Sequence, residues 1–546
     1  MAVALAACVA GIANGFAQDD VRLILGNPAI QRLANLPALF AAPYWPPPAA
    51  DLYRPLTAVL LALEYAVSPG PLLFRMVSYL LYAAAAVAVF RLGRRLLPRG
   101  IALGAALLFA AHPVHVEAVA PAVNQSELLV GLLAVLMAIR YLDRRRAGAG
   151  LLSRRDWLWL GALYVAAGLS KENGLVLPGL LLGAELFLFA GPARDRLKSL
   201  APGYALLGLL GLLMVLARTA VLSGYLAVPA PAEALDGLSA AGRGLLMLKV
   251  VPQWARLLLW PAHLQVDYGP QELMPSDHVG PAEALGALLL LGIVAAAWMT
   301  RRRAPAVGFG LVWCAVALLP VSNVVIPTGI VLAERTLLLP SIGFVIAVGG
   351  VVALLLGAAT GRVWLPRALV AGCAVLVTAG VLRSAERQGV WRNDTVLAIR
   401  AAEEAPLSYR MQTASGFALF KLGAREQAAQ AYERALALAP PKHLWRVRND
   451  IARRYWEAGK DSLAVAQLEQ SLEEAPDQEE TRSYLVLGYL ALGDYAEAAR
   501  QADVALARGG KPAEFRELRA LADSAARAGA PPGSVKVRVV PGFNPP

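Results

Sequence analysis

Long apolar runs alternate with short polar segments through the first 385 residues of the chain. A membrane-spanning helix needs roughly 20 apolar residues at about 1.5 Å per residue. Eleven runs approach that length, at about 1–17, 72–92, 101–120, 124–142, 157–170, 174–190, 200–222, 281–299, 305–322, 335–357 and 367–384. We therefore predict an all-α domain at 1–385, a polytopic bundle of about eleven transmembrane helices. The first run is interpreted as a membrane helix rather than a removable signal.

The segment from Gly244 to Trp260 is apolar but has a different pattern. Lys249, Gln253 and Arg256 interrupt its Leu, Val and Trp residues at helical spacing, as in an amphipathic helix that lies in the membrane interface. We therefore predict that 223–280 makes no net crossing. If this segment spans the membrane instead, every later helix reverses its orientation.

After about residue 386 the chain becomes charged and rich in alanine, and it repeats. Prolines recur at intervals of 34 and 36 residues, at Pro406, Pro440 and Pro476. Glycines recur at intervals of 36 and 34, at Gly423, Gly459 and Gly493. This is the period of tetratricopeptide helix pairs, so we predict an α-solenoid domain at 386–530. Its parts are a half repeat at 391–406, three repeats at 410–440, 446–476 and 480–509, a capping helix at 513–528, and then a disordered tail at 531–546.

Composition excludes a soluble protein. The chain is 58% hydrophobic and only 16% charged, with a mean hydropathy of +0.53. Its net charge of +12 does not indicate a nucleic-acid partner, because the excess arginine lies in short loops between apolar runs. Alternate loops are basic, around Arg91–Arg99, Arg144–Arg155, Arg194–Lys198, Arg301–Arg303 and Arg362–Arg367.

Basic loops face the cytoplasm, which orients the predicted helices. With eleven crossings and a cytoplasmic start, the repeats lie outside the cytoplasm. Abundant Ala, Arg, Gly and Pro suggest a GC-rich bacterial genome. We therefore expect an inner-membrane, multi-pass protein whose repeats are periplasmic.

Two adjacent carboxylates, Asp19 and Asp20, follow the first apolar run and begin the predicted external loop 18–71. An aspartate at the membrane edge can take a proton from an attacking hydroxyl. The alternative is that the pair only ends a membrane helix, since charges favour the interface. The sequence leaves open which of the two is the base.

His112, His115 and Glu117 lie close together near the point where the third and fourth predicted helices meet. The His-x-x-His spacing can hold zinc. The alternatives are a polar helix end, which we favour over a metal, or a sugar pocket. No metal site or cofactor is predicted. The sequence does not exclude a divalent ion bound by Asp19, Asp20 and a histidine. The three cysteines form no disulfide or CxxC pattern.

Lys171 and Arg335 are isolated cations at predicted external helix ends. Each can bind a lipid phosphate through charge-assisted hydrogen bonds. Each also has an acidic neighbour, Glu172 or Glu334, so a self-neutralised surface pair is the alternative. Four aromatic residues on the same side offer sugar stacking or simple interface anchoring: Trp45, Tyr53, Trp260 and Tyr268.

Six motifs occur in one order along the chain: Gly15-Phe16-Ala17-Gln18-Asp19-Asp20, Tyr53-Arg54-Pro55-Leu56, His112-Pro113-Val114-His115-Val116-Glu117, Ser170-Lys171-Glu172, Val266-Asp267-Tyr268 and Glu334-Arg335. With the C-terminal repeats, the chain resembles the transmembrane and tetratricopeptide-repeat O-mannosyltransferase family. These are GT-C class integral-membrane glycosyltransferases. Here Gln18 stands where the family often has an aromatic residue.

The resemblance implies a polyprenyl- or dolichyl-phosphate sugar as donor and a catalytic aspartate in the first external loop. We expect a polyprenyl-type lipid and no cofactor. We assign catalysis to Asp20 or Asp19. We assign donor binding to Arg54, His112, His115, Glu117, Lys171, Glu172, Asp267, Tyr268, Glu334 and Arg335. The expected acceptor is a polypeptide Ser/Thr presented by the repeat groove. The alternative is a non-catalytic, membrane-anchored scaffold for envelope proteins; a transporter would have charges in its helix middles, which are almost absent here.

Overall fold

The computed structural model describes residues 1–46, 51–147, 152–222, 232–269, 271–358, 364–509 and 512–534. These residues form two compact units, Met1–Leu397 and Ala398–Pro546. Within the described ranges the structure is helical and contains no β-strand. The predicted all-α fold class is therefore confirmed.

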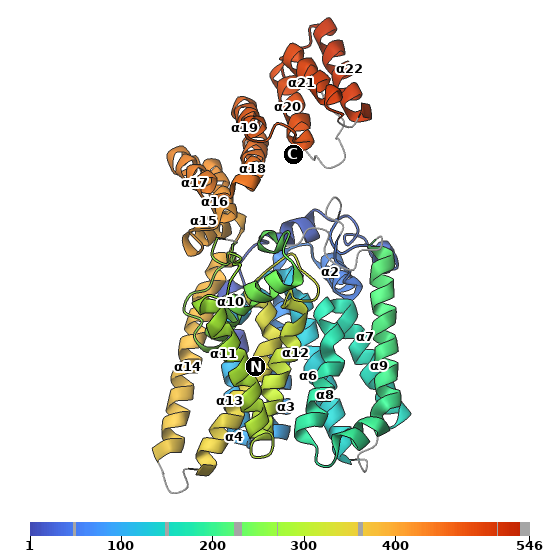
Figure 1. The fold of residues 1–546 in the computed structure, drawn as a ribbon, viewed down its shortest axis with the longest axis vertical. Coiled ribbons are helices and arrows are strands. Elements are labelled where there is room, and N and C mark those ends of the chain that lie inside the picture. The colour runs from blue at the N-terminus through green and yellow to red at the C-terminus, as the bar shows by residue number, and fades with distance from the viewer. Residues whose placement is uncertain are drawn as a thin grey trace. The chain divides into compact units, whose positions relative to one another are not determined.

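The first unit is a bundle of long helices (Figure 1). Each of the eleven predicted apolar runs contains a helix. The helices of this unit are α1 (Ala2–Cys8), α2 (Pro55–Val67), α3 (Pro71–Leu96), α4 (Arg99–Ala111), α5 (Val116–Val119), α6 (Gln125–Ala147), α7 (Arg154–Ser170), α8 (Leu177–Leu188), α9 (Ala193–Val221), α10 (Ala240–Leu259), α11 (Pro281–Thr300), α12 (Pro305–Leu318), α13 (Leu338–Ala358) and α14 (Trp364–Gln388).

Six helices in the described part of the chain are long and apolar enough to cross a membrane: α3, α6, α9, α11, α13 and α14. A seventh span exists if α4 and the following Pro113–Val119 segment count as one bent helix, with a bend of 48°. Pro113 explains the bend, because it lacks the N–H that a continuous helix requires. The chain is thus a multi-pass membrane protein, while the count of eleven crossings stays a prediction.

The predicted first helix is shorter than expected. The α-helix α1 ends at Cys8, and one 3₁₀ turn (Val9–Gly11) continues it. The remaining residues of the predicted run form the loop that leads to Asp19. Gly11 ends this turn and packs closely against the neighbouring helices, because a side chain there would collide with Gln388 and Tyr79.

Small residues bring two of the bundle helices into close contact. A Cβ added at Gly310 of α12 would lie 2.4 Å from the Gly343 carbonyl oxygen of α13, and the reverse substitution would meet Gly310 equally closely. Glycines at such positions let membrane helices pack backbone to backbone. This tight pair places the start of α13, and with it Arg335, against the bundle.

Two further helices, α2 and α10, lie at one end of the bundle, opposite the α8–α9 connection (Figure 1). Leu246, Val250 and Leu257 of α10 are buried, whereas Lys249 and Arg256 reach polar partners. This amphipathic pattern matches the prediction for 244–260, and α10 is not among the helices that qualify as spans. Its place in the membrane interface stays a prediction.

The second unit consists of paired helices that pack against their neighbours in sequence order. With the preceding α15 (Asp394–Glu404), its helices are α16 (Tyr409–Lys421), α17 (Arg425–Leu438), α18 (Leu444–Glu457), α19 (Asp461–Glu474), α20 (Glu479–Leu492), α21 (Tyr495–Ala507) and α22 (Pro512–Ala528). Gly423, Gly459 and Gly493 adopt left-handed backbone angles just after α16, α18 and α20, as helix-ending glycines do.

These pairs coincide with the three predicted repeats, although their tetratricopeptide identity stays a prediction. Most of the predicted tail, 535–546, lies outside the described residues.

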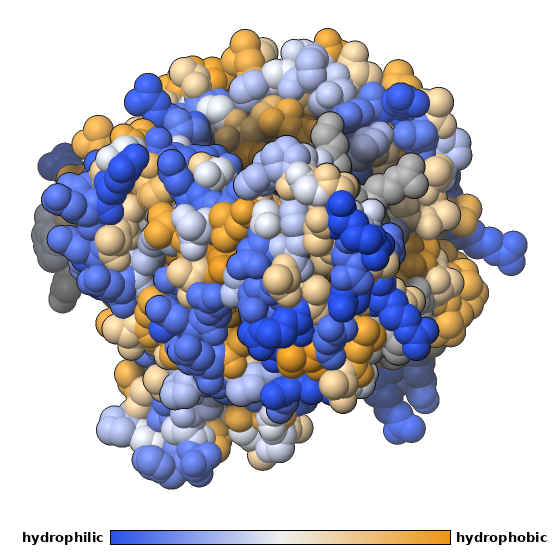
Figure 2. All heavy atoms as spheres, turned by 90° about the horizontal axis from the view of Figure 1, so that it is seen from above, coloured by the Kyte–Doolittle hydropathy of each residue, from blue (hydrophilic) through white to orange (hydrophobic). Residues whose placement is uncertain are grey.

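On the face shown in Figure 2, hydrophilic residues are scattered among hydrophobic ones, as is usual for a protein surface in contact with water.

Candidate active site

The loop that carries the two aspartates is held by a buried arginine of α3. The guanidinium of Arg75, 3% exposed, donates hydrogen bonds to the carbonyl oxygens of Asn14, Gly15 and Ala120. A buried cation with three carbonyl partners is well satisfied. Arg75 therefore fixes the path of the chain just before Asp19.

Asp20 is an anchor. Its carboxylate is fully buried and accepts hydrogen bonds from the backbone N–H groups of Ala122 and Val123, at 3.1 and 3.0 Å. These two residues begin a 3₁₀ helix (Ala122–Asn124) that leads directly into α6. Burial raises the pKa of Asp20 to about 6, against the lowering effect of Val123, Arg75 and Ala122. Both carboxylate oxygens are thus occupied in binding the loop to α6.

Asp19 is placed differently. It is half-buried and makes no side-chain hydrogen bond to any residue that the structure describes. Burial raises the pKa of Asp19; the charge of Arg335 lowers it and that of Glu117 raises it. A carboxylate with free oxygens and a raised pKa is suited to accept a proton. The geometry therefore distinguishes two residues that the sequence left equivalent.

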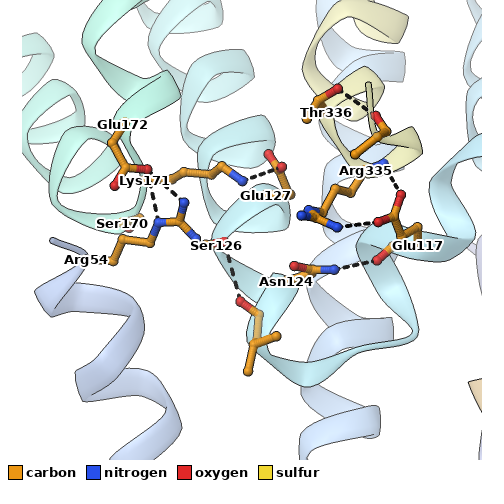
Figure 3. A network of polar contacts seen from close by, with 12 residues as sticks. Arg54, Glu117, Asn124, Ser126, Glu127, Ser170, Lys171, Glu172, Arg335 and Thr336 are labelled. Carbon is orange, nitrogen blue, oxygen red and sulfur yellow. Dashed lines mark hydrogen bonds and ion pairs between the residues drawn. The ribbon is translucent and has the colours of Figure 1, made fainter. Parts of the chain in front are cut away.

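Three ion pairs lie close together at this end of the bundle (Figure 3), and two of their cations, Arg335 and Arg54, lower the pKa of Asp19 by their charge. Lys171 Nζ lies 2.5 Å from Glu127 Oε1, and Arg54 Nη2 lies 2.9 Å from Glu172 Oε2. Arg335 binds Glu117 twice, through its guanidinium and through its backbone N–H, the latter at 2.8 Å.

The cations come from separate helix ends: Arg54 precedes α2, Lys171 follows α7, and Arg335 lies in the 3₁₀ turn Glu334–Leu337 before α13. In Figure 3, Lys171 and Arg335 point toward each other from either side of Glu127.

Two of these cations keep unused donors. Lysine has three N–H donors and arginine five, and Lys171 uses one of its three in the pair with Glu127. The Nε and Nη2 atoms of Arg335 make no hydrogen bond within the described structure, and this side chain is 20% exposed. Such donors can bind an anionic oxygen without breaking the existing pairs.

The expected alternative of sequence-adjacent ion pairs is wrong. Lys171 pairs with Glu127 rather than Glu172, and Arg335 pairs with Glu117 rather than Glu334. Consecutive side chains leave the backbone in different directions, since Lys171 is extended while Glu172 begins a 3₁₀ turn.

Both histidines have partners within the fold. The ring of His115 is buried between the Tyr82 hydroxyl and the Ser341 hydroxyl, at 2.9 and 2.8 Å. The Nε2 atom of His112 lies 3.0 Å from the Leu258 carbonyl oxygen. Within the described ranges no three His, Cys, Asp or Glu side chains are grouped to hold a metal ion. These contacts favour packing roles for both rings over the donor binding predicted for them.

Two predicted residues, Glu334 and Tyr268, form a second cluster beside the first. Glu334 is fully buried and accepts hydrogen bonds from the Tyr268 hydroxyl at 3.0 Å and the Gln265 N–H at 2.5 Å. Arg387 of α14 lies 3.8 Å from its second oxygen. Asp267, next to Tyr268, is half-buried. This cluster supports the turn that presents Arg335.

Sequence reasoning missed Glu127 and Arg75. Glu127 closes a run of four polar residues, Asn124 to Glu127, at the head of a predicted membrane helix. Such a run is unusual in a membrane-spanning helix, and it was the feature of the sequence that could have identified Glu127 as a site residue. Arg75 stood near the start of an apolar run, where a charge is ordinary, so no signal separated it from other helix-end arginines.

An apolar groove of about 470 Å³ lies among α2, α7 and α9. It is lined by Leu56, Leu158, Gly161, Ala162, Val165, Ala166, Leu206 and Leu210. Leu56 lies two residues after Arg54, and Ala166 one turn before Ser170. The groove therefore adjoins the segments that carry Arg54 and Lys171.

The fold and this site define a membrane-embedded, all-helical protein with an acidic loop and a cluster of buried and partly buried ion pairs at one end. Comparison with known proteins agrees. The model of the dolichyl-phosphate-mannose-protein mannosyltransferase family matches residues 54–219. Relatives include mouse protein O-mannosyl-transferase TMTC3, 27% identical over 364 residues, covering 61% of this chain and 40% of that protein.

Human protein O-mannosyl-transferase TMTC4 is 28% identical over 472 residues, covering 76% of this chain and 63% of that protein. Drosophila melanogaster protein O-mannosyl-transferase Tmtc2 is 32% identical over 285 residues, 47% and 29% of the two chains. The chain thus spans less than two thirds of the length of these relatives. The predicted resemblance is confirmed, and the chain is similar to TMTC proteins of the GT-C class.

Proposed function

We propose that this chain is an integral-membrane glycosyltransferase that moves a mannose-like sugar from a polyprenyl-phosphate donor to a Ser/Thr hydroxyl of a polypeptide. The observation that carries the proposal is a half-buried Asp19 with free oxygens that feels the charge of Arg335, a cation with unused donors that is partly exposed. The names of the relatives support the reaction class and a protein acceptor.

The mechanism is an inverting single displacement. Asp19 takes the proton of the acceptor hydroxyl as its oxygen attacks the anomeric carbon. The bond from that carbon to the phosphate oxygen breaks, and its electron pair leaves with the polyprenyl phosphate. Arg335 and Lys171 stabilise the negative charge on the leaving phosphate. The ion pair between Arg54 and Glu172 forms the side of the site next to Lys171.

The apolar groove among α2, α7 and α9 suits the isoprenoid chain of this donor. Its lining is aliphatic throughout, and it adjoins the segments that carry Arg54 and Lys171. A chain lying there places its phosphate end near the cations. The repeat unit is the proposed binding element for the acceptor polypeptide, and the site is proposed to face the periplasm of a bacterial inner membrane.

The test is transfer in membranes that contain the full chain, with polyprenyl-phosphate mannose as donor and Ser/Thr-containing polypeptides as acceptors. We expect an O-linked sugar that is released by β-elimination, and transfer that persists with a chelator. No transfer from any polyprenyl-phosphate sugar would contradict the proposal and favour a non-catalytic scaffold. Loss of transfer after addition of a chelator would show that the reaction needs a metal ion, which contradicts the proposed metal-free mechanism.

The pH dependence follows from two groups. As a base, Asp19 must be ionised, so activity is lost as pH falls through its raised pKa. Burial, with smaller effects from Arg54 and Arg335, lowers the pKa of Lys171 to about 8. Its charge is therefore lost as pH rises through about 8. We expect a bell-shaped profile of kcat/KM with an alkaline limb near that value.

A bound anionic phosphate favours the protonated lysine, so the alkaline limb of kcat should lie higher than that of kcat/KM. Initial rates across pH at low and saturating donor check both. Identical alkaline limbs in the two profiles would argue against contact between Lys171 and the phosphate.

A further inference from the structure

Gln18, the residue before Asp19, has an unusual backbone conformation. Its φ is +54°, a left-handed value that residues other than Gly, Asn and Asp rarely adopt. The Gln18 side chain is exposed, so packing of that side chain does not impose the conformation. Something else must hold the backbone at this point.

The holding group comes from the other end of the membrane unit. The backbone N–H of Gln18 donates a hydrogen bond to Oδ1 of Asp394, 376 residues later. Asp394 is the first residue of α15, just after α14. A charge-assisted hydrogen bond and the cost of a left-handed non-glycine residue are similar in size, so loss of this bond would allow Gln18 to relax.

Further contacts join the same two segments. The N–H of Gly15 donates to the Arg392 carbonyl oxygen at 2.8 Å, and the side-chain amide of Asn14 donates to the Gln388 carbonyl oxygen at 2.7 Å. Beneath them, Ala17 and Trp391 are buried in one apolar cluster. Segment 388–394 therefore lies along the aspartate loop from Asn14 to Gln18.

We propose that segment 388–394 is a positioning element for the catalytic loop, in which Asp394 fixes the left-handed conformation of Gln18 and thereby aims Asp19 at the acceptor hydroxyl. This inference rests on the proposed role of Asp19. Asp20, bound to Ala122 and Val123, fixes the far side of Asp19. Asp394 is a positioning residue and touches no substrate.

The experiment replaces Asp394 in the full chain. Asp394→Ala should lower kcat about tenfold, the effect of one lost charge-assisted hydrogen bond, and leave the donor KM unchanged. Asp394→Asn should retain most activity, because its amide oxygen still accepts the bond. Glu403→Ala is the matched control: it removes another carboxylate of α15, one that pairs with Arg400, but leaves segment 388–394 intact, and kcat should not change.

Hydrogen–deuterium exchange of the Gln18 amide gives a second readout that needs no activity. Exchange should be faster in Asp394→Ala and unchanged in Glu403→Ala. If the wild type transfers no sugar, the proposed function fails, yet exchange still tests the contact. Unchanged exchange in Asp394→Ala, or faster exchange with unchanged kcat, would overturn the inference.

Substitutions at Gln18 test the same contact from its other partner. Gln18→Gly tolerates the left-handed conformation and should retain transfer. Gln18→Val strongly disfavours this conformation and should lower kcat at least tenfold. Because the side chain at position 18 is exposed, the substitution should not disturb the packing of the core. Equal activity in these two variants would show that the conformation does not position Asp19.

Discussion

Replacing Asp19 with asparagine is expected to lower sugar transfer about a thousandfold, the scale of a lost general base. The amide keeps the shape of the side chain but accepts no proton at neutral pH. Because Asp19 makes no side-chain hydrogen bond within the described structure, we expect membrane insertion and thermal stability to remain those of the wild type. Initial rates with polyprenyl-phosphate mannose, together with the melting temperature in detergent, measure both effects.

The matched control is Asp20→Asn. Its amide nitrogen meets the N–H of Ala122 or Val123 in place of an accepting oxygen, which leaves buried donors unpaired at a cost of about 1–3 kcal/mol. We expect a lower melting temperature and a loss of transfer of only about tenfold. If Asp20→Asn abolished transfer without loss of stability while Asp19→Asn stayed active, the two roles would be reversed.

Removing the guanidinium of Arg335 is expected to reduce kcat at least a hundredfold, since a preorganised donor to developing charge is worth about that much. The single variant Arg335→Met also leaves Glu117 buried, at 1% exposure, without its partner. Breaking such a pair destabilises a fold by about 3–5 kcal/mol. A loss of transfer from this variant alone would not separate binding from folding.

The double variant Glu117→Gln/Arg335→Met separates them. Removing both charges of a buried pair is often neutral for stability. We therefore expect a melting temperature close to that of the wild type, while sugar transfer remains lost. The matched control is Arg145→Met/Glu185→Gln, a buried two-pronged pair at the opposite end of α6 from Glu127. It should fold and transfer normally. Recovery of transfer in the Glu117/Arg335 double variant would exclude Arg335 from phosphate binding.

The site was foreseeable in part. Charges at membrane depth are costly and therefore informative, so the sequence singled out Asp19, Glu117, Lys171 and Arg335 as exceptions to an apolar pattern. It could not show that Asp20 binds the N–H groups at 122 and 123, since that contact joins residues about a hundred positions apart. The histidine pair suggested a ligand set, yet His115 lies between Tyr82 and Ser341.

By itself the sequence determined the helices and their order, because hydropathy and helical periodicity are local properties of the chain. The recurring Gly423, Gly459 and Gly493 likewise marked helix ends, since a left-handed residue after a helix is a local requirement. Only the tertiary structure decided which charges meet: Lys171 with Glu127 and Arg335 with Glu117. Those pairs depend on how helix ends converge across 44 and 218 residues of chain, and side-chain direction at such distances is set by packing.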